Sequence, residues 1–319
     1  MDTSGSPCCA PSRDSGEEEF SKEVSAVTNT AALLDSNFVT IPAGYFLMGT
    51  DEDFYPTDGE NPARRVWTDE YQISKYSVTN QEFARFVDET SYVTDAENFG
   101  WSYVYCGFLD EETISQKSVG VAGIAPWWVG IKDASWSNPF GNGETIESLL
   151  NHPVVHISRN DAQGFCRWSG TRLPTEAEWE RASRGGLSNA TYPWGNDVDI
   201  NNGEMLNVWM GEFLPLESRQ SFHHGTMPVD SFSANSFGIY NTVGNVWEWT
   251  SDTWSARWHI ADTPETRRNP KGPASGGKNV LKGGSFMCHD SYCYRYRNSA
   301  RSSNSPETST SNIGFRCAR

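Results

Sequence analysis

The stretch RLPTEAEWE at residues 172–180 decides how the middle of this chain folds. Pro174 ends the segment before it, and Thr175 is a typical N-cap residue. Glu178 stands three positions after Thr175, which is the spacing of a capping box, and acidic residues favour the positive end of a helix. The stretch therefore predicts a helix that begins after Thr175.

Two further helices are predicted by similar signals. Thr79 and Glu82 form the same capping-box pattern, with Phe83 and Phe86 on one face of the helix that follows. A helix beginning at Ser158 or Asn160 should end at the following glycine, Gly170.

Short strands are predicted on the N-terminal side of these helices. Residues 38–41 precede a Pro/Gly turn, and residues 46–49 continue the pattern. Residues 65–67 and 71–73 are predicted to pair with each other, after an acidic loop at residues 51–61. Residues 100–150 hold four tryptophans among Gly and Pro and carry no assignment, and loops and short strands are expected from Gly185 onward. The class is α+β: one compact domain at residues 37–319, with short strands, a few helices and low regular secondary structure.

Composition excludes several functions. The chain has 319 residues and a formal net charge of -16, and an acidic surface disfavours nucleic acid and anionic membrane surfaces as partners. No apolar run of about 18 residues predicts a membrane-spanning helix. Residues 1–36 lack a signal-peptide pattern and predict a disordered acidic tail that contains Cys8 and Cys9. The expected location is cytoplasmic, where seven cysteines do not suggest a disulfide scaffold.

The strongest chemical signal is GGSFMCHDSYCYRYR at residues 283–297. Cys288 and Cys293 stand five positions apart, so they meet only if the segment forms a loop. A structural disulfide, a soft-metal site and a thiol redox pair all fit this spacing. Arg295 and Arg297 would favour thiolates, and they fit ordinary surface ion pairs equally well.

A second candidate site is NTVGNVWEW at residues 241–249. Oxygens of Asn and Glu, with carbonyls between them, suit calcium, while a glycine turn before a Trp-rich strand explains the same residues without an ion. The six histidines form no His-x-x-x-His pair on a predicted helix and no facial iron triad. The chain also shows no phosphate-binding glycine loop and no Gly-x-Ser-x-Gly motif, which argues against nucleotide and serine-hydrolase chemistry.

Several segments together resemble one family, the formylglycine-generating enzymes or sulfatase-modifying factors, in their prokaryotic form. The similarity runs from about Phe38 to Arg319 and includes IPAG, DGE, PARR, APWW, HPVVH, RLPTEAEWE, GNVWEW and NIGFRC. Many of these mark a broad superfamily, whereas the stretch from Gly283 to Cys293 is specific, because inactive paralogues lack the cysteine pair. The resemblance implies a C-type-lectin-like fold.

The resemblance also implies an activity. Cys288 and Cys293 would hold Cu(I), Ser285 would lie near an oxygen pocket, and Trp247 would line that pocket. The reaction would be the copper-dependent oxidation by O2, with a thiol reductant, of a cysteine to Cα-formylglycine. The substrate would be an unfolded or nascent sulfatase polypeptide carrying Cys-x-Pro-x-Arg.

Calcium sites and a disulfide follow from the same resemblance. One Ca2+ site would use Asn241, Gly244, Val246 and Glu248. A second would begin at Asn207 and Val208, with its remaining ligands among Glu217, Ser221 and His223. Cys166 and Cys317 match a family disulfide, while Ser183 and Asn298 stand where eukaryotic relatives have another. The alternatives are a non-catalytic or differently specific paralogue on this fold and a thiol-disulfide exchanger.

Overall fold

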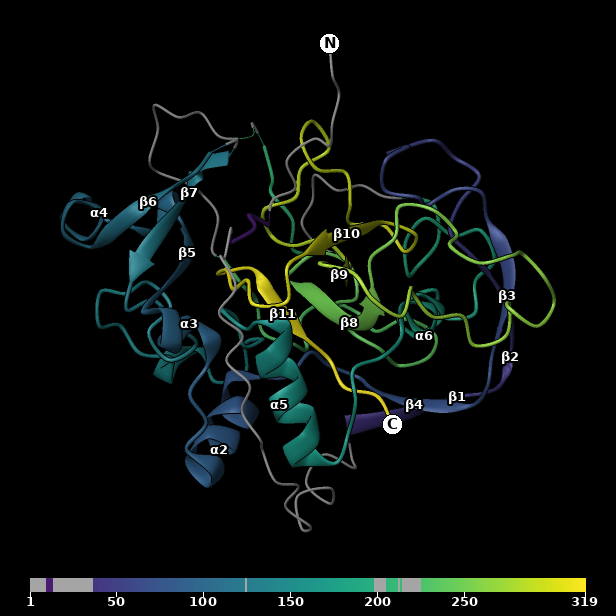
Figure 1. The fold of residues 1–319 in the computed structure, drawn as a ribbon, viewed down its shortest axis with the longest axis horizontal. Coiled ribbons are helices and arrows are strands. Elements are labelled where there is room, and N and C mark those ends of the chain that lie inside the picture. The colour runs from purple at the N-terminus through teal and green to yellow at the C-terminus, as the bar shows by residue number, and fades with distance from the viewer. Residues whose placement is uncertain (1–9, 14–36, 124, 198–204, 212, 214–224) are drawn as a thin grey trace.

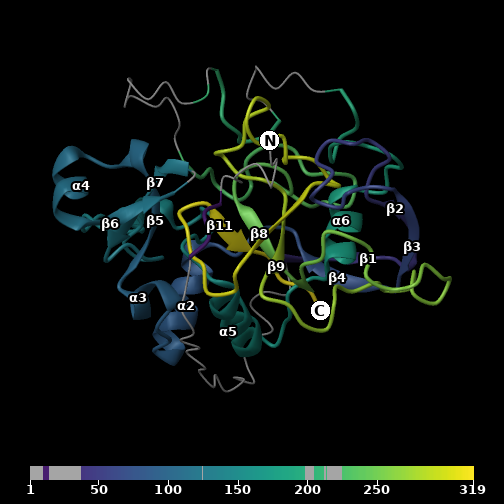
Figure 2. The same cartoon turned by 45° about the horizontal axis from the view of Figure 1, so that its top comes forward.

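A computed structural model describes residues 10–13, 37–123, 125–197, 205–211, 213 and 225–319 (Figure 1). A four-stranded sheet lies at the centre of the molecule. Figures 1 and 2 both show a separate three-stranded sheet on one side of it and the strand pair β2–β3 on the other. Helices are few and strands short, so the predicted fold class is confirmed. Among the described residues, no helix has the length and apolar character needed to cross a membrane.

The three predicted helices are present. Helix α2 (Asn80–Thr90) has the expected capping box at Thr79, α5 (Arg159–Ser169) begins after the N-cap Ser158, and α6 (Glu176–Ser183) begins after Thr175. Helix α5 ends at Gly170, whose φ of 67° is left-handed. Two short helices were not predicted, α3 (Asp95–Phe99) and α4 (Glu111–Lys117), nor were the 3-10 turns at Cys106–Phe108 and Glu147–Leu149.

The first four strands lie where they were predicted, but their predicted pairing is wrong. Strand β1 (Phe38–Ile41) pairs with β4 (Tyr71–Ser74), and β2 (Gly44–Met48) pairs with β3 (Arg64–Thr68), both antiparallel. The chain therefore bends twice, at residues 42–43 between β1 and β2 and at residues 69–70 between β3 and β4. Arg181 of α6 holds these bends by donating to the carbonyls of Pro42, Gly44 and Thr68. The local sequence does not indicate these bends, because Arg181, which holds them, lies more than 100 residues further along the chain.

Residues 101–132 form a three-stranded antiparallel sheet where no element was assigned. Its order is β5-β7-β6, from β5 (Trp101–Tyr105), β6 (Ser118–Ala122) and β7 (Ala125–Lys132). Strand β7 begins with Ala125 and Pro126, and β6 leaves Val119 and Val121 exposed. The sequence does not indicate these strands, because they contain a proline and glycines and lack an alternation of buried and exposed residues.

The central sheet has the order β10-β9-β8-β11. Its strands are β8 (Trp247–Thr253), β9 (Asn279–Lys282), β10 (Arg301–Asn304) and β11 (Ile313–Phe315). Strand β9 is antiparallel to both β8 and β10, while β11 runs parallel to β8 on the other edge. Residues 283–300, called the cysteine loop below, therefore leave and re-enter the sheet on neighbouring strands.

Aromatic side chains join α2 and α5 to the sheet. Phe83 and Phe86 of α2 face Phe165 of α5 with ring centroids 6.0 and 5.7 Å apart, and Phe165 contacts Phe315 of β11 at 5.4 Å. All four rings are fully buried. Each contributes about 1.5–3 kcal/mol by leaving water, so this cluster anchors the helices under the sheet.

Four residues of the predicted disordered tail differ from that prediction. Residues 10–13 lie against the domain, with Ala10 and Arg13 buried. The other residues of the predicted tail, 1–9 and 14–36, lie outside the described part of the chain.

Candidate active site

The cysteine loop begins at two positions whose backbone conformation requires glycine. Gly283 and Gly284 have φ angles of 94° and 74°, and a Cβ on Gly283 would lie 2.5 Å from the Thr242 carbonyl oxygen. Any other residue would be strained and would clash there. The chain can therefore turn sharply out of β9 and return its thiols to the interior.

The loop brings the two predicted cysteines together. The Sγ atoms of Cys288 and Cys293 are 3.3 Å apart, and both side chains are fully buried. The Ser285 N–H donates to the Cys288 sulfur at 3.4 Å, and the Cys293 N–H donates to the His289 carbonyl at 2.6 Å. The two sulfurs form no disulfide with each other, and both are soft donors in a water-excluded position.

Asn312, which was not a predicted site residue, contacts both Ser285 and Trp247. Asn312 donates from its side chain to the Ser285 hydroxyl at 2.9 Å, and its carbonyl accepts the Trp247 N–H at 2.9 Å. Thr310 donates to the Asn312 side-chain oxygen at 2.6 Å, which fixes the orientation of the amide. The segment before β11 thereby holds the predicted catalytic serine in place. Its only sequence signal was the position of Asn312 at the head of the NIGFRC segment.

A guanidinium lies next to the cysteine pair. Arg295 Nη1 is 3.9 Å from Cys293 Sγ, and its Nε donates to Asp58 at 2.6 Å. Burial raises the pKa of Asp58 above its ordinary value, and Arg295 opposes that rise. Tyr55 lies under the same guanidinium, with its ring centroid 3.9 Å away, and its hydroxyl accepts the Tyr294 N–H. The predicted acidic loop thus covers the residues that follow Cys293, and the arginine places positive charge where thiolates would form.

A second ion pair joins the same two loops. Arg297 binds Glu60 through two bonds of 2.6 and 2.7 Å, and Ser299 adds a third donor at 3.0 Å. Both Arg297 and Glu60 are buried. The alternative in which Arg295 and Arg297 are surface charges is therefore wrong, because both arginines lie inside the protein and hold the cysteine loop.

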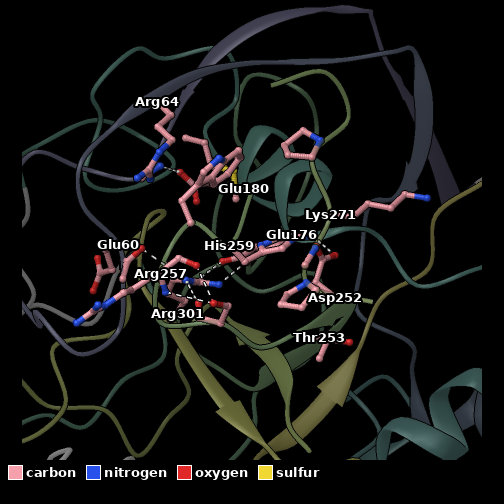
Figure 3. A pocket seen from close by; sticks show the side chains of 18 of the residues that line it. Glu60, Arg64, Glu176, Glu180, Asp252, Thr253, Arg257, His259, Lys271 and Arg301 are labelled. Atoms are coloured by element: carbon pink, nitrogen blue, oxygen red, sulfur yellow. Dashed lines mark hydrogen bonds and ion pairs between the residues drawn. The ribbon is translucent and has the colours of Figure 1, made fainter. Parts of the chain in front are cut away.

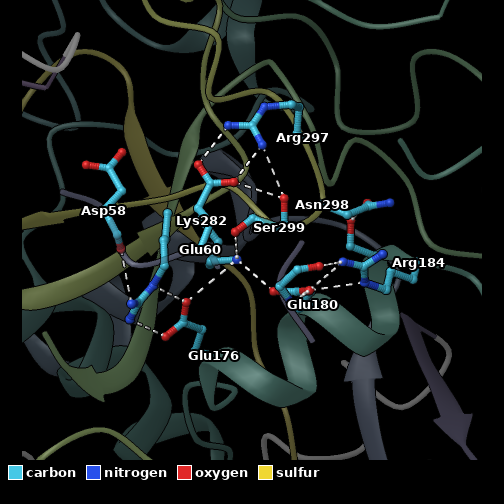
Figure 4. A network of polar contacts seen from close by, with 12 residues as sticks. Asp58, Glu60, Glu176, Glu180, Arg184, Lys282, Arg297, Asn298 and Ser299 are labelled. Carbon is cyan, nitrogen blue, oxygen red and sulfur yellow. Dashed lines mark hydrogen bonds and ion pairs between the residues drawn. The ribbon is translucent and has the colours of Figure 1, made fainter. Parts of the chain in front are cut away.

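The base of the loop rests on a buried network of charges (Figure 4). Lys282, fully buried at the end of β9, contacts Glu180 at 3.1 Å and Glu176 at 3.7 Å. Arg184 and Arg301 complete the pairing of these two carboxylates. Burial alone would raise the pKa of Glu180, but Lys282 and Arg184 lower it below its ordinary value. Helix α6, which the 172–180 stretch predicted, thereby supports the entrance to the cysteine loop.

Half-exposed aromatic rings surround the outer side of the cysteine loop. Tyr292 packs edge-on against Trp127 at 5.1 Å and stacks on Phe213 at 4.8 Å, and Phe213 also stacks on His289 at 5.6 Å. These rings come from β7, from the loop that contains residue 213 and from the cysteine loop. They form an apolar surface next to the buried thiols, which suits contact with a polypeptide.

A cavity of about 60 Å3 lies elsewhere and does not include the cysteine pair. Figure 3 shows its charged lining, which includes Glu176, Asp252, Arg257 and Arg301. Glu176 and Arg301 bind each other at 2.7 Å, so two of the lining groups are already paired. Burial, aided by the charge of Glu176, raises the pKa of Asp252 to about 6. This cavity contains neither Cys288 nor Cys293.

The first predicted calcium segment forms the turn that leads into β8. Gly244 has a φ of 76° and donates its N–H to the Gly283 carbonyl, so the turn abuts the start of the cysteine loop. The Asn241 side chain donates to the carbonyls of Pro228 and Val229. Val246 is buried beside the sheet.

Glu248, the carboxylate of that segment, is fully occupied. Arg316 binds both of its oxygens, at 2.6 and 2.8 Å, and Ser77 and Trp179 donate at 2.8 and 2.7 Å. These four donors fill the acceptor positions of a carboxylate. The carboxylate as placed does not fit a calcium ligand, since an ion there would have to displace one of the donors. Among the described residues, no group of three or more His, Cys, Asp or Glu side chains could hold a metal ion.

The second predicted calcium segment lies directly against the first. The Asn207 carbonyl accepts the Asn245 N–H at 2.7 Å, and the Asn207 amide donates to Gly225 and Asn245. Val208 is buried. Glu217, Ser221 and His223, the candidates for the remaining ligands, lie outside the described residues.

The predicted disulfide positions differ in their contacts. Cys166 of α5 and Cys317 are buried thiols with sulfurs 3.9 Å apart, and they are not bridged in this structure. Ser183 donates to Asn298 at 2.7 Å, so a hydrogen bond joins the two positions where eukaryotic relatives carry cysteines.

Comparisons with known proteins show what this chain is similar to. The family described as "Sulfatase-modifying factor enzyme 1-like domain" matches residues 24–319. The formylglycine-generating enzyme of Mus musculus is 48% identical over 304 residues, covering 94% of this chain and 80% of that protein. The formylglycine-generating enzyme of Thermomonospora curvata is 48% identical over 281 residues, covering 88% of this chain and 92% of that protein. The structure of PvdO from Pseudomonas aeruginosa has a TM-score of 0.59 at 22% identity, covering 88% and 93% of the two chains, and supports the fold alone.

Proposed function

This chain belongs to the sulfatase-modifying factor enzyme 1-like family, and from that premise we propose that it converts a cysteine in sulfatase polypeptides to Cα-formylglycine. The proposed substrate is an unfolded or nascent chain that carries Cys-x-Pro-x-Arg. The proposed oxidant is O2, and a thiol supplies the two further electrons.

The observation that carries the proposal is the buried thiol pair, with sulfurs 3.3 Å apart. Two thiolates are soft ligands that suit Cu(I), and zinc would require further ligands that the described residues do not place there. Cys288 and Cys293 are the residues that would hold a copper ion. Copper bound there would supply one-electron chemistry with O2.

The reaction balances with a thiol as co-reactant. The substrate side chain –CH2–SH, one O2 and two thiols give –CHO, hydrogen sulfide, one water and one disulfide. The substrate loses its C–S bond and one C–H bond, and O2 is reduced to the aldehyde oxygen and water.

The residues of this chain prepare the site for that chemistry. Burial of the cysteines excludes water, the Ser285 N–H donates to one sulfur, and the Arg295 guanidinium compensates negative charge at the other. Asn312 holds the Ser285 hydroxyl through a direct hydrogen bond. Trp247 lies in the same apolar cluster as both cysteines and provides a rigid wall.

A thiol-disulfide exchanger remains the second candidate, because the same pair at 3.3 Å could cycle between dithiol and disulfide. That function requires no copper and leaves the carbon skeleton of its substrate unchanged. A non-catalytic or differently specific paralogue is the third, and would convert no sulfatase peptide.

We also propose calcium as a structural ion and a cytoplasmic location. Calcium is supported by the resemblance and by the packing of the segments containing Asn207 and Gly244, but it requires that Glu248 exchange one of its present donors. The location is supported by the unbridged thiols of Cys166 and Cys317, which suit a reducing compartment.

Mass spectrometry of a synthetic peptide containing Cys-x-Pro-x-Arg tests the activity. The peptide is incubated with the protein, Cu(I), O2 and a thiol, and we expect conversion of its cysteine to the aldehyde. Conversion should fail without copper and in Cys288→Ser and Cys293→Ser. Cys106→Ser, which removes a thiol outside the pair, is the matched control and should retain activity.

The result separates the candidates. Peptide disulfide exchange without copper, with no aldehyde, would establish the exchanger. An unchanged peptide under all conditions would leave the non-catalytic or differently specific paralogue.

A further inference from the structure

A short segment from early in the chain, residues 10–13, is bound by residues that follow it by almost 300 positions. The Arg13 N–H donates to the Thr308 hydroxyl at 2.9 Å. The Asn304 amide donates to the carbonyls of Pro11 and Ala10 at 3.0 and 3.4 Å. Side chains from the end of β10 and the turn after it thus hold the backbone of residues 10–13 at both ends.

The side chain of Arg13 fills a built pocket. Its Cζ lies 4.1 Å from the ring centroid of Phe99 and 3.8 Å from that of Trp101, and Nη2 donates to the Trp101 carbonyl at 2.8 Å. Arg13 is only 4% exposed, which is rare for arginine outside a specific site. Burial lowers the pKa of Arg13 to about 10, and the negative charges of Asp95 and Glu307 oppose that shift. Stacking, charge and a carbonyl together select an arginine.

The residues that hold the segment are close in the chain to a residue that contacts the cysteine loop. Residues 304–309 contact the segment, and Asn312, three residues further on, donates to the Ser285 hydroxyl of the cysteine loop. Ala10 belongs to the same cluster of contacting apolar side chains as Cys288 and Cys293. One continuous stretch of chain therefore binds the segment and positions the proposed active site.

The sequence of the segment matches the proposed substrate. Residues 9–13 read Cys-Ala-Pro-Ser-Arg, which is Cys-x-Pro-x-Arg. Of the seven cysteines in the chain, only Cys9 is followed by Pro two positions later and Arg four positions later. The motif and the bound segment are independent observations, one from sequence and one from contacts.

We propose that the sequence Cys-x-Pro-x-Arg at residues 9–13 is an internal copy of the substrate, whose residues 10–13 occupy the substrate-binding surface of their own chain and compete with external sulfatase polypeptides. The inference rests on the proposed function for the identity of the motif. It adds the recognition site itself: Asn304 and Thr308 hold the substrate backbone, and Phe99 and Trp101 bind the substrate arginine.

Covalent linkage makes such a competitor strong. A linked segment acts at an effective concentration on the order of mM, and it raises the apparent KM and Kd of a free peptide by the ratio of that concentration to its own dissociation constant. For any affinity tighter than about 0.1 mM, releasing the segment should strengthen peptide binding at least about tenfold.

The test compares the full-length wild-type chain with Arg13→Ala. One readout is the KM for conversion of a Cys-x-Pro-x-Arg peptide. The other is the Kd of a fluorescent Ser-Ala-Pro-Ser-Arg peptide, measured by anisotropy, which requires no turnover. We expect both constants to fall at least about tenfold in Arg13→Ala, with kcat unchanged. Lys22→Ala, which removes a positive charge outside the motif, is the control and should match the wild type.

The readouts separate this inference from the proposed function. Equal Kd values in the wild type and Arg13→Ala would overturn the inference, whether or not the peptide is converted. A lower Kd without conversion by any variant would overturn the proposed function and leave the occupied surface standing. In the Arg13→Ala background, Trp101→Ala should weaken binding of the external peptide, and unchanged binding would show that the external peptide uses another site. Conversion of Cys9 itself, detected in the mass of the 1–13 tryptic peptide, would support the same occupancy.

Discussion

Replacing Arg297 with methionine would remove one partner of the ion pair that joins the acidic loop to the cysteine loop. The side chains of Arg297 and Glu60 are 0% and 2% exposed, and their closest contact is 2.6 Å. With charge centres about 4 Å apart and an effective dielectric constant of about 20, the attraction is about 4 kcal/mol. Among the described residues, the variant leaves the buried Glu60 carboxylate with Ser299 as its one side-chain donor, so we expect a loss of about 3–5 kcal/mol in the free energy of unfolding.

A double-mutant cycle isolates the pair from its surroundings. Glu60→Gln, Arg297→Met and the double variant are compared by guanidinium unfolding followed by tryptophan fluorescence. Because the double variant leaves no buried charge, we expect it to recover part of the loss, with a coupling energy of about 2–4 kcal/mol. The control is Arg85→Met, which breaks an exposed pair with Glu89 whose side chains are 44% and 33% exposed. Its expected cost is about 0.3–0.5 kcal/mol.

The reasoning would be refuted by a coupling energy below about 1 kcal/mol, because the pair would then behave as a solvent-screened surface contact. A large coupling energy with unchanged peptide conversion would show that the ion pair stabilises the fold without shaping the site.

Three further predictions follow from single contacts. Burial raises the pKa of Asp252 from 3.8 to about 6. Between about pH 4 and pH 6 the folded state therefore holds a proton on this carboxyl that the unfolded state has lost. The free energy of unfolding should fall by about 3 kcal/mol as the pH rises across that range. Asp252→Asn should flatten that part of a pH series of denaturation curves, and an unchanged slope would exclude this carboxyl as its source. Mild oxidation should bridge Cys166 and Cys317, whose sulfurs are 3.9 Å apart, and raise stability by about 2–4 kcal/mol; peptide mapping that finds only free thiols would contradict this. Thr175→Ala should cost about 1 kcal/mol, measured by chemical denaturation, because it removes the N-cap of α6; a cost indistinguishable from zero would mean that tertiary contacts alone fix that helix end.

The sequence could have revealed the internal substrate copy, since Cys-x-Pro-x-Arg was both the expected substrate motif and the sequence of residues 9–13. The composition of residues 1–36, which is typical of a disordered tail, gives no sign that four of them dock on the domain. Composition reports average burial, whereas four residues can dock through one arginine pocket and a few backbone contacts. No local pattern in the tail indicates Phe99 or Trp101 as partners.

The sequence by itself determined the helix starts at Thr79, Ser158 and Thr175. It also determined the glycine turn at residue 283 and the two thiols on which the proposed activity depends. These features depend on neighbours a few residues apart, so they are visible in any short window of the chain. The tertiary structure alone decided the pairing of β1 with β4, the three-stranded sheet and the placement of Asn312 between Ser285 and Trp247. The tertiary structure also determined which charged side chains are buried in ion pairs. Arg295, Arg297 and Glu248 each bind an oppositely charged side chain, because the fold brings chain segments up to 237 residues apart within hydrogen-bonding distance.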